Sequence, residues 1–206
     1  MKIYPITDEH RTMIRHFADI FKPGQKKHSE TELLKAASES FRPNEAKCTG
    51  CGAVGGFSYH GEYRRNLVVF DNEVNTLDLC ISRHVCASCG RTHAVLPPFI
   101  VPFGSYSLFF IIKVLREYFS RRIMGLTVSD ICERHLISVS TLYKWKSLFL
   151  AHKSLWLGIL EDLKVSDLDF LTMHVPCPSS LKGFSGRFGF SFLQNRAEAA
   201  TVSAVP

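Results

Sequence analysis

The sequence of 206 residues lacks the features that mark secretion or membrane insertion. Its most apolar run, SLFFIIKVL, is interrupted by Lys113 and falls short of the roughly 18 to 20 residues that span a bilayer. The first residues, MKIYPITDEHRTMI, lack the basic-then-apolar order of a secretory signal. We therefore expect a cytoplasmic protein that has no membrane partner.

The sequence also has no recognisable grouping of catalytic side chains. His60, His135 and His152 have no evident partner for nucleophilic catalysis. The 60 residues after Lys146 contain the acidic residues Asp162, Asp167, Asp169 and Glu198. This segment has no strand-rich pattern that would bring their carboxylates together around a pair of metal ions. We interpret them as solvated surface and expect no enzyme activity.

Cysteine is present in an odd number, seven, which in a reducing compartment argues against a disulfide framework. Four of the seven form two C-x2-C pairs, in CTGCG at 48–52 and CASCG at 86–90, with 34 residues between the pairs. Each pair directs two sulfurs toward one point, and the glycine after each pair permits a tight turn. We expect Cys48, Cys51, Cys86 and Cys89 to hold a structural Zn²⁺ that stabilises a small β-hairpin.

Two other interpretations of these residues stay open. A single C-x2-C pair is also typical of thioredoxin-like redox sites, although two copies without a βαβ pattern favour a structural metal. His93 could replace Cys89 as a ligand, but His93 and His84 are better explained as strand residues. Four thiolates leave no open coordination position, so a hydrolytic metal centre is disfavoured.

The segment between the cysteine pairs is typical of a long hairpin. From Leu77 to Val85 apolar residues and Arg83 alternate with polar ones, the period of a half-buried strand. Cys80 falls on the face opposite the apolar side, so we do not expect it to be a ligand. Residues 57–70 are the predicted partner strand and 71–73 the predicted hairpin tip.

Residues 105–122 have helical spacing, and 127–149 are typical of two short helices joined by a tight turn. The expected buried positions are Ile131, Ile137, Leu142 and Trp145, with Cys132 as the small residue at the crossing. Thr127 or Ser129 can cap the first helix, and Ser138 the second. Leu136 replaces the usual turn glycine and His135 precedes it, which predicts a distorted or lengthened turn.

The basic charge gathers in the same region. Residues 104–153 contain 8 Lys and Arg against 3 Asp and Glu, and so carry +5 of the total +6. Cationic side chains bind DNA phosphates, and the start of the second helix of such a motif enters the major groove. We therefore predict double-stranded DNA as partner, with phosphate contacts from Arg121, Arg122, Lys144 and Lys146, and base-side contacts from Ser138, Val139, Ser140, Thr141 and Tyr143.

ISVSTLYKW resembles the recognition-helix region of recombinases and transposases of bacterial insertion elements. The order of C-x2-C pair, hairpin, second pair, basic helix and helix-turn-helix is similar to the N-terminal DNA-binding region of zinc-ribbon transposases. Through CTGCG, HGEYRR and ISRHVCASCGRTHAVLPPF the chain also resembles a bacterial zinc-ribbon domain family of unassigned function. The resemblance covers about residues 46–156 and implies a mobile-element protein without a nuclease domain.

We accordingly predict the α+β class, with a zinc ribbon packed against a mostly helical unit. The expected divisions are N-terminal helices at 1–45, a four-cysteine zinc ribbon at 46–103, a helix-turn-helix domain at 104–165 and a poorly structured tail at 166–206. Within the first division, 7–22 and 29–41 are predicted helices. The alternative function is a zinc-stabilised protein-interaction module or accessory subunit, whose partners would be a second copy or a separate transposase or regulatory chain.

Overall fold

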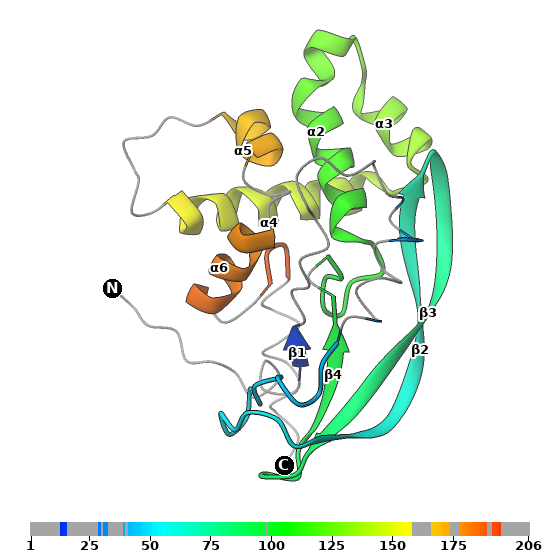
Figure 1. The fold of residues 1–206 in the computed structure, drawn as a ribbon. Coiled ribbons are helices and arrows are strands. Elements are labelled where there is room, and N and C mark those ends of the chain that lie inside the picture. The colour runs from blue at the N-terminus through cyan, green and yellow to red at the C-terminus, as the bar shows by residue number, and fades with distance from the viewer. Residues whose placement is uncertain are drawn as a thin grey trace, which may run out of the picture.

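The fold combines a curved sheet with a group of helices, and it was analysed as a computed structural model (Figure 1). The structure describes residues 13–15, 29, 31–32, 39, 41–97, 99–157, 166–173, 178–188 and 191–194. The strands are β1 (Met13–Arg15), β2 (Phe57–Asp71), β3 (Glu73–Cys86) and β4 (Thr92–Leu96), in the order β1-β4-β3-β2. β2, β3 and β4 are antiparallel, and β1 pairs in parallel with β4. This mixed content agrees with the predicted class.

A long hairpin arm, β2 with β3, is the main feature of the sheet. Its pairing runs from Phe57 opposite Cys86 to Asp71 opposite Glu73, and Asn72 alone makes the tip with a φ of 63°. The predicted tip at 71–73 is therefore confirmed. At about 3.3 Å per residue the arm follows a path of roughly 45 Å, so its cysteine end and its tip lie far apart (Figure 1).

The predicted alternation along β3 holds only in part. Ile81 is buried and Cys80 is exposed, as expected. Arg83 is exposed and His84 is buried, which is contrary to the predicted pattern. The reason is tertiary, because two aromatic rings cover His84 on the face that the pattern assigned to solvent, those of Phe41 and Tyr59.

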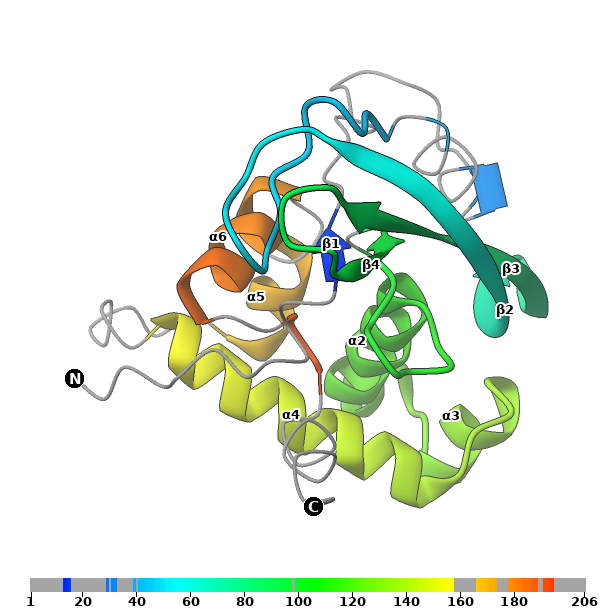
Figure 2. The same ribbon diagram turned by 90° about the horizontal axis from the view of Figure 1, so that it is seen from below.

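The helices are α2 (Leu108–Met124), α3 (Val128–Arg134), α4 (Val139–Leu157), α5 (Asp167–Met173) and α6 (Pro178–Phe188). Four of them begin at a hydroxyl that accepts a hydrogen bond from a backbone N–H three residues later, at Ser107, Thr127, Ser138 and Ser166. The caps expected at Thr127 and Ser138 are thus confirmed. Figure 2 shows the helices gathered on one side of the sheet.

The main core lies where the helices meet the tip half of the arm. The predicted buried positions Ile131, Ile137, Leu142 and Trp145 all belong to it. At the tip, the Phe70 ring lies 5.8 Å from the His135 ring, and the Lys113 ammonium lies 4.0 Å from the Phe70 centroid. The arm is therefore fixed to the helices at its tip, while its other end carries the cysteines.

At both ends of the chain the structure differs from the sequence predictions. Met13–Arg15, inside the predicted helix at 7–22, is the strand β1; the rest of 7–22 lies outside the described residues. At 29–41 the Ser29 hydroxyl accepts from the Glu32 N–H, as a helix cap does, but most of that range is also outside the description.

The tail at 166–206, predicted to be poorly structured, contains α5 and α6 in its described part. Three of its phenylalanines are buried in the main core, Phe170, Phe184 and Phe192. Residues 195–206 are outside the description. Among the helices that are described, none has the length and apolar character needed to cross a membrane.

Candidate metal centre and candidate nucleic-acid interface

Each C-x2-C pair is held in a tight turn by the backbone. The N–H of Gly52 donates to the Cys48 carbonyl at 2.9 Å, and the N–H of Gly90 donates to the Cys86 carbonyl at 2.8 Å. Both glycines take a left-handed conformation, with φ of 80° and 69°, which residues with a side chain rarely adopt. The glycine that follows each cysteine pair in the sequence thus closes the turn that presents the sulfurs.

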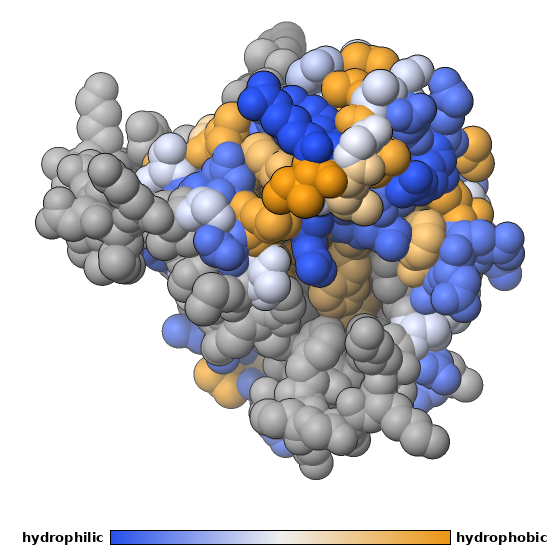
Figure 3. All heavy atoms as spheres, turned by 90° about the horizontal axis from the view of Figure 1, so that it is seen from above, coloured by the Kyte–Doolittle hydropathy of each residue, from blue (hydrophilic) through white to orange (hydrophobic). Residues whose placement is uncertain are grey.

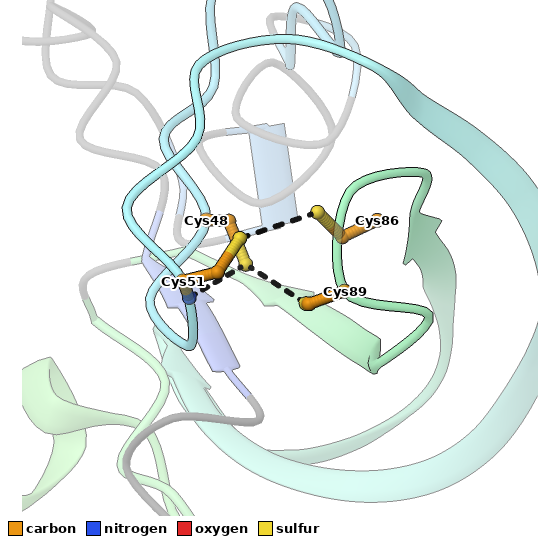
Figure 4. Close-up of side chains that lie close together, drawn as sticks. All are labelled: Cys48, Cys51, Cys86 and Cys89. Atoms are coloured by element: carbon orange, nitrogen blue, oxygen red, sulfur yellow. Dashed lines mark hydrogen bonds between the residues drawn. The ribbon is translucent and has the colours of Figure 1, made fainter.

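The four sulfurs converge from the two turns (Figure 4). The Sγ atoms of Cys48 and Cys89 are 3.7 Å apart, those of Cys51 and Cys86 are 3.8 Å apart, and all four lie within 4.8 Å of one another. A tetrahedron with Zn–S bonds of about 2.3 Å has edges of about 3.8 Å. The predicted set of four cysteines therefore forms a cluster that could hold a metal ion.

The electrostatic surroundings of the sulfurs are unequal in the metal-free state. Burial opposes ionisation of Cys86, but backbone N–H groups of Cys89 and Ser88 and the neighbouring thiols outweigh it and lower its pKa to about 7. The Ala53 N–H favours a Cys51 thiolate, yet burial and the adjacent thiols raise the pKa of Cys51 to about 11. A cation among the sulfurs would remove this imbalance by favouring the thiolate at every position.

His93 lies in β4, as predicted for a strand residue, but it also has a contact that the sequence did not predict. Its Nε2 lies 3.3 Å from the Cys48 sulfur, and its Nδ1 lies 3.4 Å from the Thr49 hydroxyl. The ring is fully buried and packs edge-on against Phe57. When Thr49 donates to Nδ1, Nε2 carries the proton and donates to the sulfur. His93 therefore contacts a cysteine of the cluster, whereas His84 packs among aromatic rings as a strand residue.

The connection between α3 and α4, predicted to be distorted or lengthened, has four residues, 135–138, and so is not lengthened. Leu136 takes the left-handed conformation usual for glycine, with a φ of 52°, and its side chain is 76% exposed. His135 fills the apolar position before it and is fully buried. Its Nε2 lies 3.0 Å from a Glu117 carboxylate oxygen, which also accepts from Arg134 at 3.2 Å.

The start of α4 presents polar side chains outward. Five of the predicted contact residues in and just before α4 are exposed: Ser138, Val139, Ser140, Tyr143 and Lys144. Thr141 and Lys146 are half-buried. The Ser138 hydroxyl also lies 2.8 Å from the hydroxyls of Ser140 and Thr141, so a short row of hydroxyls marks this helix start.

Basic side chains of α2 and α4 meet at the buried ring of Tyr118. The Arg121 guanidinium lies 4.1 Å from the ring centroid and donates to the Tyr118 carbonyl at 2.7 Å. The Lys146 ammonium lies 5.2 Å from the same centroid and 5.7 Å from that of Tyr143. The structure therefore brings Arg121, Tyr143 and Lys146 together, while Arg122 is exposed in the last turn of α2.

The comparisons with known proteins add one finding. Residues 48–145 match the family model described as a domain of unknown function (DUF6431). The matched range begins at the first cysteine of the cluster and ends within α4, so it contains the four cysteines, α3 and the first part of α4. No curated protein and no solved structure matches the chain.

Proposed function

We propose that the protein binds double-stranded DNA, in a sequence-specific or structure-selective manner, and that it is related to transposase recognition regions but lacks a nuclease domain. The observation that carries this proposal is the arrangement of Arg121 and Lys146 on Tyr118, beside the exposed start of α4. Two cations held by one aromatic ring are positioned in advance, so less side-chain entropy is lost when they bind phosphates.

In this proposal α3 and α4 form a helix-turn-helix, and α4 enters the major groove with its N-terminal residues. The hydroxyls of Ser140 and Thr141, with Tyr143, are short or planar groups suited to base edges. Lys144 is exposed on the same helix and reaches the phosphates beside Lys146. Arg121 and Arg122 extend the phosphate contacts along the end of α2.

The proposed metal is a structural Zn²⁺ held by Cys48, Cys51, Cys86 and Cys89. Four thiolates and sulfur separations of 3.7 and 3.8 Å suit tetrahedral zinc better than Mg²⁺ or Ca²⁺, which prefer oxygen ligands. Zinc would cross-link the two turns and would supply no catalysis. Elemental analysis of protein purified without added metal should give about one zinc per chain.

The DNA proposal is tested with the double variant Lys144→Ala/Lys146→Ala. We expect weaker binding to duplex DNA and a salt dependence whose log–log slope falls by about two, since each lost phosphate contact lowers it by about one. The matched control is Lys182→Ala/Arg187→Ala, which removes the same charge from exposed positions of α6. Equal losses in the two variants would show that only net charge matters, and unchanged binding would count against α4.

A second candidate function rests on exposed apolar side chains at the end of α2 and in the α3–α4 connection. Ile123 is 87% exposed, Met124 53% and Leu136 76%. Figure 3 looks onto this end and shows apolar side chains among hydrophilic ones. Such residues favour a protein-interaction module, with a second copy as the simplest partner. Sedimentation of wild type and Ile123→Ser, together with a mobility shift on random duplex at low salt, separates the two functions.

A further inference from the structure

The inner face of the sheet contains a cleft that the duplex proposal does not use. It has a volume of about 690 Å³ and is open to solvent, within the range of sites that bind nucleotide-sized ligands. Its lining comes from all three antiparallel strands and from the loop before α2: Tyr63, Arg65, Asn66, Arg83, Thr92, Ala94, Leu96, Phe103, Gly104 and Ser105.

The strand register explains why two arginines share this face. Arg83 pairs with Gly61 of β2 and with Ala94 of β4, and Arg65 pairs with Leu79. Since alternate residues of a strand share a face, both arginines lie on the side of Ala94. The acidic residues of the same strand segments, Glu62 and Asp78, fall on the opposite face, where Asp78 pairs with Arg64 at 2.8 Å.

The cleft therefore combines two positive charges with no carboxylate among its described lining residues. The guanidinium of Arg65 donates to the Gly104 carbonyl, which fixes the group without neutralising it. Arg83 is exposed, and no ion pair of Arg83 is found within the described part of the chain. Two cations in a partly apolar cleft favour an anionic ligand.

An aromatic residue at the rim occupies a conformation that its side chain disfavours. The Gly104 N–H donates to the Val101 carbonyl at 3.1 Å, so residues 101–104 form a turn in which Phe103 has a φ of 60°. Glycine is the usual residue at the left-handed position of such a turn. Phe103 is instead 59% exposed, and Tyr63, on the β2 side of the cleft, is 38% exposed. An exposed ring kept at a strained position points to use of the ring.

We propose that this cleft binds a nucleotide unit of an unpaired nucleic-acid strand, with bases stacked on Phe103 and Tyr63 and phosphates on Arg65 and Arg83. Basic grooves with exposed aromatic rings are what sequence-tolerant single-strand binding requires. Because the cleft is open, a strand can continue past it. The hydroxyls of Thr92 and Ser105 can bond base or sugar edges.

The test measures fluorescence anisotropy of a labelled 12-nucleotide oligo(dT) with the full zinc-loaded chain at low salt. The variant Arg83→Gln/Phe103→Asn removes one charge and one ring, and asparagine tolerates the left-handed backbone. We expect at least tenfold weaker oligo(dT) binding and unchanged duplex binding. Lys144→Ala/Lys146→Ala should show the reverse, so the failure of this site and of the proposed duplex site are distinguishable.

Further outcomes decide the proposal. If the double variant does not fold, as judged by circular dichroism, the single variants Arg83→Gln and Tyr63→Leu replace it, and each should weaken oligo(dT) binding at least threefold. Wild-type affinity in these variants, or no oligo(dT) binding by the wild type, would overturn the proposal. Thymidine 5′-monophosphate is tested as a competitor of the labelled oligo(dT). If it competes at concentrations as low as those of unlabelled oligo(dT), the cleft is a pocket for free nucleotides and the proposal is overturned.

Discussion

The Nε2 atom of His93 lies 3.3 Å from the sulfur of Cys48, and both side chains are buried. A donor held against a thiolate stabilises its negative charge and orients it toward a bound cation. The Thr49 hydroxyl lies 3.4 Å from Nδ1, and when it donates there the proton of the His93 ring is on Nε2, which makes this donation. His93 therefore supports the candidate metal centre from outside the set of four sulfurs.

His93→Phe should weaken zinc binding by about 10- to 100-fold, because the ring stays but the donor is lost. Competition with a chromogenic chelator measures the affinity, and the Co²⁺-loaded variant should keep a tetrahedral four-thiolate absorption spectrum. The exposed His60 offers the control variant His60→Gln. A shifted Co²⁺ spectrum in His93→Phe would mean instead that His93 is itself a ligand.

Removal of the metal should loosen one end of the molecule only. Cys48, Phe57 and Cys86 form a small buried cluster separate from the main core, which contains the helices and the tip half of the arm. After chelation we expect residues 46–57 and 84–93 to lose protection in amide hydrogen exchange, while α2 and α4 keep theirs. Zinc should restore the protection. Cooperative loss over the whole chain would show that the arm couples the two cores.

Leu136→Gly should stabilise the protein by about 0.5 to 1 kcal/mol. Leu136 has a φ of 52° and an exposed side chain, so its backbone strain is not offset by burial. The left-handed conformation costs an L-residue roughly 1 to 2 kcal/mol. Glycine avoids this cost, but it loses more backbone entropy on folding, which offsets about 0.5 to 1 kcal/mol of the gain in stability. Urea unfolding measures the change. A loss of stability would mean that the Leu136 side chain makes a contact worth more than the strain.

The parts of this fold that sequence reasoning found are local. A cysteine pair with its glycine, a tip at 71–73, and the hydroxyl caps Thr127 and Ser138 each depend on a few neighbouring residues, and each is present in the structure. The helices around Ile131 and Leu142 could also be predicted from the sequence, because the residues of one buried helix face recur every three to four positions.

The parts that were missed depend on distant partners. Met13–Arg15 forms a strand because it pairs with the edge of β4. Met13 lies opposite Ala94, which is 81 residues later in the sequence. His84 becomes buried because the rings of Phe41 and Tyr59 pack against it. The tail did carry a usable signal, since Leu181, Phe184 and Phe188 have helical spacing, but Gly183 and Gly186 between them argued for irregular structure.

The charge of Asp130 should make the stability of the α3 end depend on pH. The pKa of Asp130 is lowered, first by the hydrogen bond from the Thr127 N–H, then by that from the Thr127 hydroxyl. A carboxylate whose pKa is lower in the folded state stabilises the fold above its unfolded pKa of about 3.9, and that contribution is lost as the pH falls through the folded pKa.

The variant Asp130→Asn keeps the shape of the side chain and removes its charge. The difference in unfolding free energy between wild type and variant should therefore be largest near pH 6 to 7 and should shrink toward pH 3. The exposed residue Asp78 gives a matched variant, Asp78→Asn, whose ion pair with Arg64 lies on the arm, away from any helix start. An equal difference for Asp130→Asn at both ends of the pH range would show that the charge of Asp130 does not stabilise the cap.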